Sequence, residues 1–194
     1  MKQPLLLPLL FSALLSLFAS VSSAGITLSE PKLYESDSRI WVNVEFKYEL
    51  GNEVIDAMKN GIPLVFHAEY RIEEMKPLWE ENPITHTIEH RFILSYREFT
   101  NRYYLISLQN NTHGTYDNLS DALARMERRH TALNIDRNTL ERNSNYQARV
   151  RASLDGSALP GLIRPYLYTP YLWPQWKLDS GWHTLSLMGF LPWG

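Results

Sequence analysis

Residues 39–48 read R-I-W-V-N-V-E-F-K-Y, and this stretch decides the fold class of the chain. Alternate positions are apolar, and most of the positions between them are polar or charged. A period of two puts the two sets on opposite faces of an extended strand, so one face is buried and the other is solvated. The pattern predicts a half-buried β-strand whose inward side chains are Ile40, Val42, Val44, Phe46 and Tyr48.

The same alternation recurs further along the chain. It covers residues 64–73, 84–96 and 146–154. The second of these stretches passes through a turn at residues 98–101 into another strand-like run at 102–108. Two extended runs joined by a short turn are typical of an antiparallel hairpin.

Two segments carry a helical period instead. In residues 51–60 the apolar side chains fall on one side, and Gly61 then ends the helix. In residues 118–130 apolar side chains recur at spacings of three and four, behind Asn118 as the expected N-cap. We interpret the other side of this second helix as a solvated face; it carries Arg125, Arg128 and Arg129.

These elements favour an all-β fold with two antiparallel sheets packed face to face. We predict an antiparallel β-sandwich, immunoglobulin-like or similar, with two short connecting helices. No linker or internal repeat marks a second domain. The expected organisation is a signal peptide over residues 1–24, followed by a single β-sandwich domain over residues 25–194.

The first 24 residues predict where the protein resides. Lys2 precedes an uncharged leucine-rich run at 5–18, and small residues at 21–24 form a signal-peptidase site. We therefore expect a mature chain that begins near Gly25 and is exported, most simply to a bacterial periplasm. Residues 5–21 together are close to the ~17 residues that span a bilayer, so an uncleaved leader kept as an anchor is the alternative.

Composition excludes several classes of protein. The chain contains 0 cysteines, which excludes disulfides, a thiol nucleophile, a cysteine metal site and a lipid anchor on an N-terminal cysteine. The 19 basic and 21 acidic residues give a formal net charge of −2. Such a balance gives no reason to expect nucleic acid as a partner.

One pentapeptide matches a catalytic motif. Residues 86–90 read H-T-I-E-H, which has the H-x-x-E-H order of one class of zinc peptidases. Histidines at i and i+4 share a zinc ion only on a helix, and on a strand they lie about 13 Å apart. The segment alternates apolar and polar residues and contains β-branched Thr85 and Thr87. We therefore expect a strand there, and neither a metal nor a cofactor.

The C-terminal third is rich in proline and aromatic residues. Four of the six tryptophans fall there. Proline removes a ladder donor, so residues 162–176 are expected to lie extended over a sheet edge, and 176–187 to pair as a closing strand. The rings have two possible roles, a surface that stacks sugars or grips a peptide and ordinary core packing. The candidate binding residues are Tyr166, Tyr168, Tyr171, Trp173 and Trp176.

Several short phrases lie along the chain in a fixed order and spacing. They are A-M-K-N-G-I-P-L at 57–64, Tyr96, L-S-D-A-L at 119–123, Tyr146, V-R at 150–151, L-D at 154–155, L-P at 159–160 and W-x-L-x-S-x-W at 176–182. Together they resemble domain of unknown function family 4390, a family of exported proteobacterial proteins. The resemblance implies a mostly β protein with a signal peptide, often encoded beside a membrane sensor histidine kinase of a nitrogen-regulation type. It implies no activity, cofactor or catalytic residue.

Export, fold and resemblance together predict a non-enzymatic binding or interaction module. Its expected partner is an envelope protein such as a sensor histidine kinase, and membrane contact is expected only through a retained leader. Two alternatives stay open. One is a glycan-binding module that uses the C-terminal aromatic residues, and the other is a zinc-dependent hydrolase that uses His86, Glu89 and His90.

Overall fold

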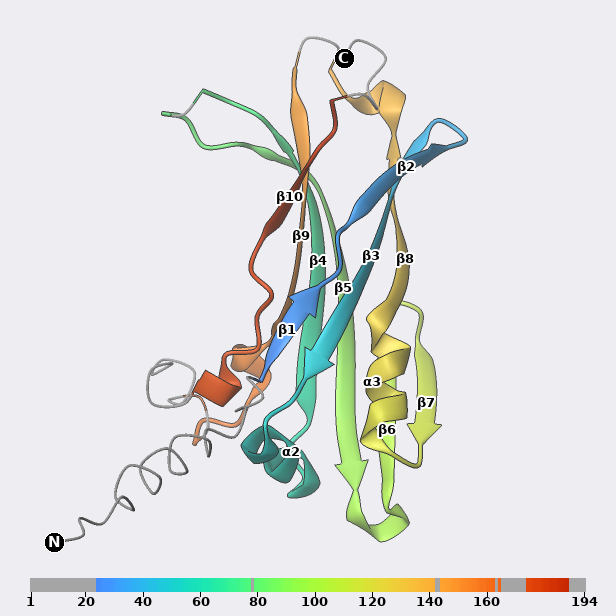
Figure 1. Cartoon of the computed structure of the whole chain (residues 1–194), viewed down its shortest axis with the longest axis vertical. Helices are drawn as coiled ribbons and strands as arrows, with labels where there is room; N and C mark the ends of the chain where they lie inside the picture. Colours follow the sequence, from blue (N-terminus) through green and yellow to red (C-terminus); the bar gives the residue numbers. More distant parts are fainter. Residues whose placement is uncertain (1–23, 78, 142–143, 163, 165–173, 189–194) are drawn as a thin grey trace, which may run out of the picture.

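The computed structural model describes residues 24–77, 79–141, 144–162, 164 and 174–188, and within them two antiparallel sheets face each other (Figure 1). The predicted antiparallel β-sandwich is confirmed. The smaller sheet contains β1 (Gly25–Leu28), β2 (Lys32–Ser36), β3 (Arg39–Glu49) and β8 (Arg128–Asp136). The larger sheet has the order β10 (His183–Ser186), β9 (Tyr146–Leu154), β4 (Leu64–Glu74), β5 (Ile84–Arg97), β6 (Arg102–Ser107) and β7 (Thr112–Tyr116).

Strand β3 is the centre of the smaller sheet and contains the stretch 39–48. Its inward side chains at alternate positions are all buried, as the period of two predicts. Strands β1 and β2 follow one another along one edge of β3, and β8 pairs with the other edge. A strand paired on both edges has its backbone donors and acceptors satisfied along its length.

Strand β4 holds the corresponding place in the larger sheet, between β5 and β9. Tyr70 lies opposite Ile88 of β5 and Val150 of β9, so the three strands present one inner face in register. The inner face of β4 is buried at every position from the start of the strand as far as Ile72. Its outer face carries Glu69 and Arg71, which are half-buried.

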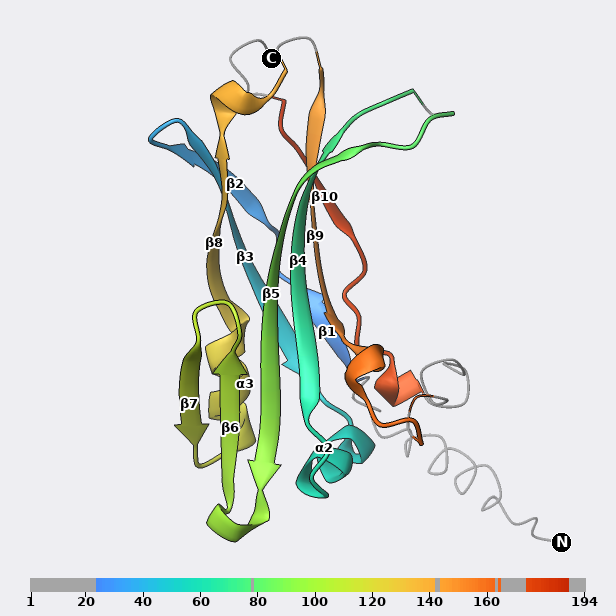
Figure 2. The same cartoon turned by 180° about the vertical axis from the view of Figure 1, so that it is seen from behind.

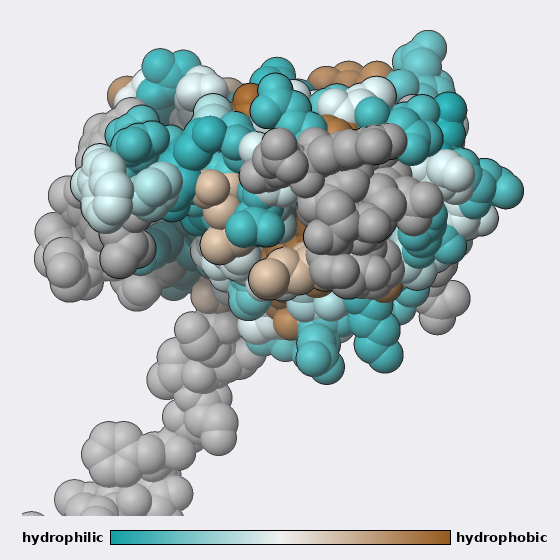
Figure 3. All heavy atoms as spheres, turned by 90° about the horizontal axis from the view of Figure 1, so that it is seen from above, coloured by the Kyte–Doolittle hydropathy of each residue, from teal (hydrophilic) through white to brown (hydrophobic). Residues whose placement is uncertain are grey.

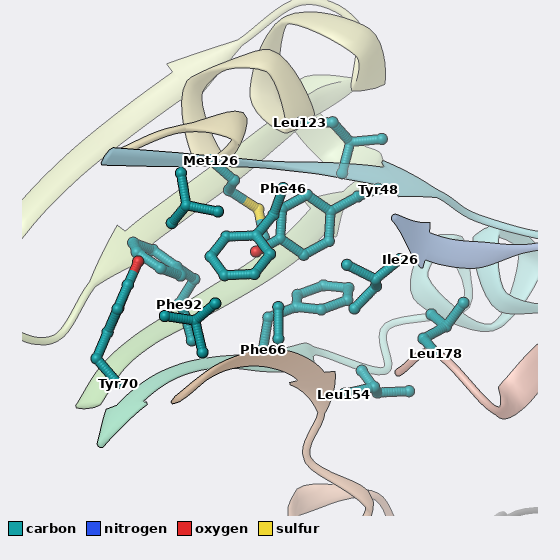
Figure 4. Packing of buried hydrophobic residues seen from close by; sticks show 14 of the residues in the cluster. Ile26, Phe46, Tyr48, Phe66, Tyr70, Phe92, Leu123, Met126, Leu154 and Leu178 are labelled. Atoms are coloured by element: carbon teal, nitrogen blue, oxygen red, sulfur yellow. The ribbon is translucent and has the colours of Figure 1, made fainter. Parts of the chain in front are cut away.

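The hydrophobic core fills the space between the sheets (Figure 4). Tyr48 of β3 meets Phe66 of β4 edge-on, with ring centroids 5.3 Å apart. Phe46 meets Tyr70 in the same way at 6.4 Å. Such edge-to-face pairs add attraction to the burial of the rings and hold the two sheets in one relative position.

Helix α2 (Asn52–Lys59) confirms the first predicted helix and buries Val54 and Met58. It ends where Gly61 adopts φ +90, a conformation that suits glycine because it has no Cβ. Helix α3 (Leu119–Glu127) confirms the second. The side-chain oxygen of Asn118 accepts a hydrogen bond of 2.9 Å from the backbone N–H of Asp121, which is the predicted cap.

The predicted C-terminal extent of this second helix is wrong. Helix α3 ends at Glu127, and residues 128–136 form β8 instead of continuing to His130. The cause lies far away in the sequence, because residues 128–136 pair as β8 with the edge of β3 along residues 39–45. Pairing with that edge satisfies a row of backbone groups, and local helical preference does not outweigh it.

Three short strands were not predicted from the sequence pattern. β1, β2 and β7 have only 4, 5 and 5 residues, which is too few for a clear period of two. The closing strand is confirmed in part, since β10 occupies residues 183–186 of the predicted 176–187. No helix in the part of the chain that the structure describes is long and apolar enough to cross a membrane.

Candidate interaction site

The H-x-x-E-H pentapeptide lies on strand β5, as predicted. His86 pairs across the sheet with Ile72 of β4, and His90 pairs with Ala68. Tyr70 lies between Ile72 and Ala68 on the same face of β4, so the two histidines are not neighbours. The ring of His90 packs edge-on against Tyr70, with centroids 5.7 Å apart. Extended backbone therefore separates the two imidazoles, and within the described ranges no group of three or more metal-ligating side chains is positioned to hold an ion.

Of the five residues predicted to form an aromatic binding site, the structure describes only Trp176. Trp176, at the end of the short 3-10 helix Pro174–Trp176, is 4% exposed and belongs to the core cluster. This matches the core-packing interpretation for that ring. Tyr166, Tyr168, Tyr171 and Trp173 lie outside the described residues, so a sugar- or peptide-binding role for them stays a prediction.

The W-x-L-x-S-x-W phrase has a structural explanation. Trp176 and Leu178 are 4% and 2% exposed and pack into the core. The N–H of Ser180 donates to the carbonyl oxygen of Ala152, and its hydroxyl accepts from the N–H of the same residue, both at 2.9 Å. This double contact ties the segment to the edge of β9 and directs Trp182 over the outer face of the larger sheet.

Trp182 covers a layer of arginines on that outer face. The guanidinium carbons of Arg71, Arg149 and Arg151 lie 4.4, 4.8 and 5.6 Å from the centre of its ring. Cations stacked on an indole are attracted to the negative face of the ring. The layer therefore holds the C-terminal segment against strands β4 and β9.

Each of these arginines also has a carboxylate partner. Arg151 forms two hydrogen bonds with Asp179, at 2.9 and 2.5 Å. Arg149 contacts Glu73 at 3.2 Å, and Arg71 contacts Glu69. Three cations facing three carboxylates leave no excess charge for a ligand, so we interpret this layer as structural rather than as a binding site.

Asp179 makes the attachment of the C-terminal segment sensitive to acid. Burial alone would raise the pKa of Asp179, but hydrogen bonds from Arg151 and from the N–H of Gly181, with attraction to Arg151 and Lys177, lower it below the usual 3.8. A lowered pKa stabilises the fold above the unfolded value, and that stability is lost as the pH falls from about 4 through the folded value.

We therefore expect wild-type protein to lose thermal stability as the pH falls below about 4, and Asp179→Asn to flatten that decline. The variant is also expected to melt lower than wild type at pH 7, because it loses the ion pair with Arg151. The measurement is the melting temperature of both proteins at a series of pH values from 7 to 2.5. Parallel acid limbs for the two proteins would contradict the assignment to Asp179.

The β4–β5 hairpin projects beyond the sandwich at the end opposite helix α2 (Figures 1 and 2). Three large apolar side chains on it face solvent, with Trp79 83% exposed, Ile84 49% and Met75 47%. Seen from this end, the described surface is mostly hydrophilic, with apolar residues in small groups (Figure 3). We call residues 75–77 and 79–84 the hairpin tip.

Hydrogen bonds hold the base and turn of the tip in place. The backbone N–H of Glu74 donates to the carbonyl oxygen of Pro83 at 3.0 Å, where the two strands separate. The N–H of Lys76 donates to the side-chain oxygen of Asn82 at 2.8 Å. These two contacts join the two arms of the hairpin at described positions, which limits the entropy lost when a partner covers the exposed side chains.

Phe99 is another large exposed apolar residue. Phe99 is 101% exposed on the turn between β5 and β6, but its neighbours Glu98 and Thr100 are exposed polar residues. The hairpin tip was not predicted from the sequence, because only the aromatic residues of the C-terminal third were considered as a binding site and Trp79 was not. A usable signal was present, since a tryptophan between Pro77 and Pro83 stands where turn residues predict an exposed loop.

Comparison with known proteins gives one match. A family model described as a domain of unknown function, DUF4390, matches residues 23–186. The matched range includes all the described strands and both helices. No curated protein matches the chain. No solved structure matches it either.

Proposed function

The chain belongs to the DUF4390 family, and from this premise we propose that it is an exported, periplasmic interaction module that binds another envelope protein through its hairpin tip. The leader sequence at residues 1–24 supports export. The partner suggested by the family resemblance is the sensor domain of a membrane histidine kinase.

The observation that carries the proposal is the exposure of Trp79 at the end of a projecting hairpin. Tryptophan is enriched among the few residues that supply most of the binding energy of an interface. Its ring is 83% exposed here, and Met75 and Ile84 on the same hairpin are exposed as well. An apolar group of this kind on an ordered projection is typical of a contact site, because a partner can bury it without rearranging the sandwich.

The charges around the tip define the partner further. Glu80 and Glu81 follow Trp79 directly and are exposed. The one lysine of the tip, Lys76, is paired with Glu74 at 2.6 Å. The tip thus presents apolar side chains beside acidic ones, which suits an apolar pocket with a basic rim on a protein. Acidic side chains would be repelled by an anionic lipid surface, so a protein partner is favoured over the membrane.

Phe99 provides a matched control for the experiment. A photoreactive amino acid is placed at position 79 in one protein and at position 99 in another, each produced with its leader in the native host. We expect a specific crosslinked partner from position 79 and none from position 99, because only the hairpin tip enters the interface. Equal crosslinking from both positions would contradict the proposal.

The partner identified in this way is then purified for a direct binding measurement. We expect Trp79→Ala to weaken its binding by at least about tenfold, which is the usual scale for loss of a central tryptophan. Phe99→Ala is expected to bind as wild type. Unchanged binding by Trp79→Ala, with its melting temperature intact, would exclude the hairpin tip as the contact site.

A further inference from the structure

A small cavity lies between helix α3 and the inner face of strands β6 and β7, a region where these elements cover one another (Figure 2). Its volume is about 130 Å³, which is room for several water molecules or for one small ion. It lies on a different part of the larger sheet from the hairpin tip, at the far side of β5 from β4. The polar residues that line it are Ser107, Asn110, Thr112, His113, Tyr116 and Arg125.

Ser107 is the least expected residue in this wall. It occupies an inner-face position of β6, next in the alternation after the buried apolar residues Tyr103 and Leu105. It is 6% exposed, and its hydroxyl has no hydrogen-bond partner among the residues that the structure describes. Buried hydroxyl groups are nearly always hydrogen-bonded, so an unpartnered one on a cavity wall indicates a group that is met by something in the cavity.

Gly114 and Tyr116 of β7 shape the part of the same sheet wall that lies beside β6. They are alternate residues of β7, and Gly114 lies directly opposite Leu105 of β6. A Cβ at position 114 would lie 2.5 Å from the hydroxyl oxygen of Tyr116. Only glycine therefore allows the tyrosine ring to lie along the strand, which keeps its hydroxyl group at the cavity.

The charge of the lining has one sign. Arg125 reaches the cavity from helix α3, and the residues around it are hydroxyl, amide, imidazole or apolar, without a carboxylate. In contrast to the arginines under Trp182, Arg125 forms no ion pair with any residue that the structure describes. A guanidinium with several hydroxyl donors and no competing carboxylate is the chemistry that proteins use for small oxyanions.

We infer that this cavity binds a small oxyanion, held by Arg125 and by the hydroxyl groups of Ser107, Thr112 and Tyr116. Arg125 was predicted on the solvated face of helix α3, and in the structure this face borders the cavity. The site is independent of the proposed contact through the hairpin tip, and either can exist without the other.

The test is a titration of the purified full-length protein with inorganic phosphate, sulfate and acetate in parallel, at constant ionic strength with chloride as the balancing anion. Binding is followed by heat release and by the amide NMR signals of β6, β7 and α3. We expect saturable binding of at least one anion, with shifts centred on Ser107 and Thr112. The anion that binds most tightly distinguishes a phosphate-like ligand from a carboxylate.

Three variants make the outcome decisive. Arg125→Gln is expected to weaken binding at least fivefold, because the charged donor is lost. Ser107→Ala is expected to weaken it severalfold without a lower melting temperature, since the free protein loses only an unpartnered hydroxyl. Arg102→Gln is the control, because Arg102 carries the same charge on β6 but is 53% exposed and paired with Asp117. It is expected to bind as wild type.

Two results would overturn the inference. The first is the absence of saturable binding for all three anions. The second is binding that Arg125→Gln and Ser107→Ala leave unchanged, or that Arg102→Gln weakens as much as Arg125→Gln does. Both results leave the crosslinking experiment on the hairpin tip unaffected.

Discussion

Phe66→Ala is expected to lower the free energy of unfolding by about 3–5 kcal/mol, the usual cost of removing a buried aromatic ring. Phe66 is 0% exposed and lies on β4, the strand that β5 and β9 flank. Its ring meets Tyr48 of the opposite sheet (Figure 4). Alanine would leave a cavity between the sheets that the paired strands cannot close, because hydrogen bonds hold β4 on both edges.

Urea denaturation followed by circular dichroism measures this loss, and Phe99→Ala is its control. Phe99 is the same residue type at 101% exposure, so its replacement is expected to change stability by less than about 0.5 kcal/mol. A loss of similar size from both variants would show that the two sheets are not packed through Phe66 in solution.

Glu73→Ala is expected to be the second most damaging change, at about 2–3 kcal/mol. Glu73 is 3% exposed, although it is a charged residue. Its carboxylate accepts hydrogen bonds from Gln147 Nε2 at 2.9 Å and from Arg149 Nη1 at 3.2 Å. Removing one partner of a buried pair costs about 3–5 kcal/mol, and we expect less here because Arg149 keeps 29% of its side-chain surface in contact with water.

A double-mutant cycle with Arg149→Ala separates the ion pair from the lost packing. We expect the double variant to be more stable than the sum of the two single losses predicts, because each single variant leaves a charge without its partner. The control is Glu89→Ala, which breaks a pair with Arg91 at an exposed site where the side chains are 42% and 49% exposed. A loss below about 1 kcal/mol is expected there. An equal loss from Glu73→Ala and Glu89→Ala would contradict the buried role of Glu73.

The candidate sites differ in how far the sequence could predict them. The strand at residues 84–97 was readable from its alternation, and with it the separation of His86 and His90. The hairpin tip was only partly readable. Its turn residues predict a loop, but the exposure of Trp79 depends on whether another segment covers it. The cavity at Ser107 could not be predicted from the sequence. It forms where helix α3, which carries Arg125, lies over strands β6 and β7, and no local pattern indicates that contact.

The charged outer face of β4 and β9 illustrates the same limit. The alternation over residues 64–73 and 146–154 predicts that Arg71, Arg149 and Arg151 face outward, and the structure agrees. It could not show that Trp182 lies over all three, because the chain returns to this face only after β9 has formed the sheet edge. Side-chain direction along a strand is a local property, whereas what covers that face is not.

By itself, the sequence determined which faces of the long strands are buried, where both helices begin and that the fold is a β-sandwich. These features follow from the period of apolar side chains and from capping and turn residues, which act over a few neighbours. Only the tertiary structure decided that residues 128–130 leave the helix for β8, that Ser180 bonds to β9 and that Glu73 is buried. In each case the deciding partner is a backbone edge or a side chain far away in the sequence, and no local pattern contains that information.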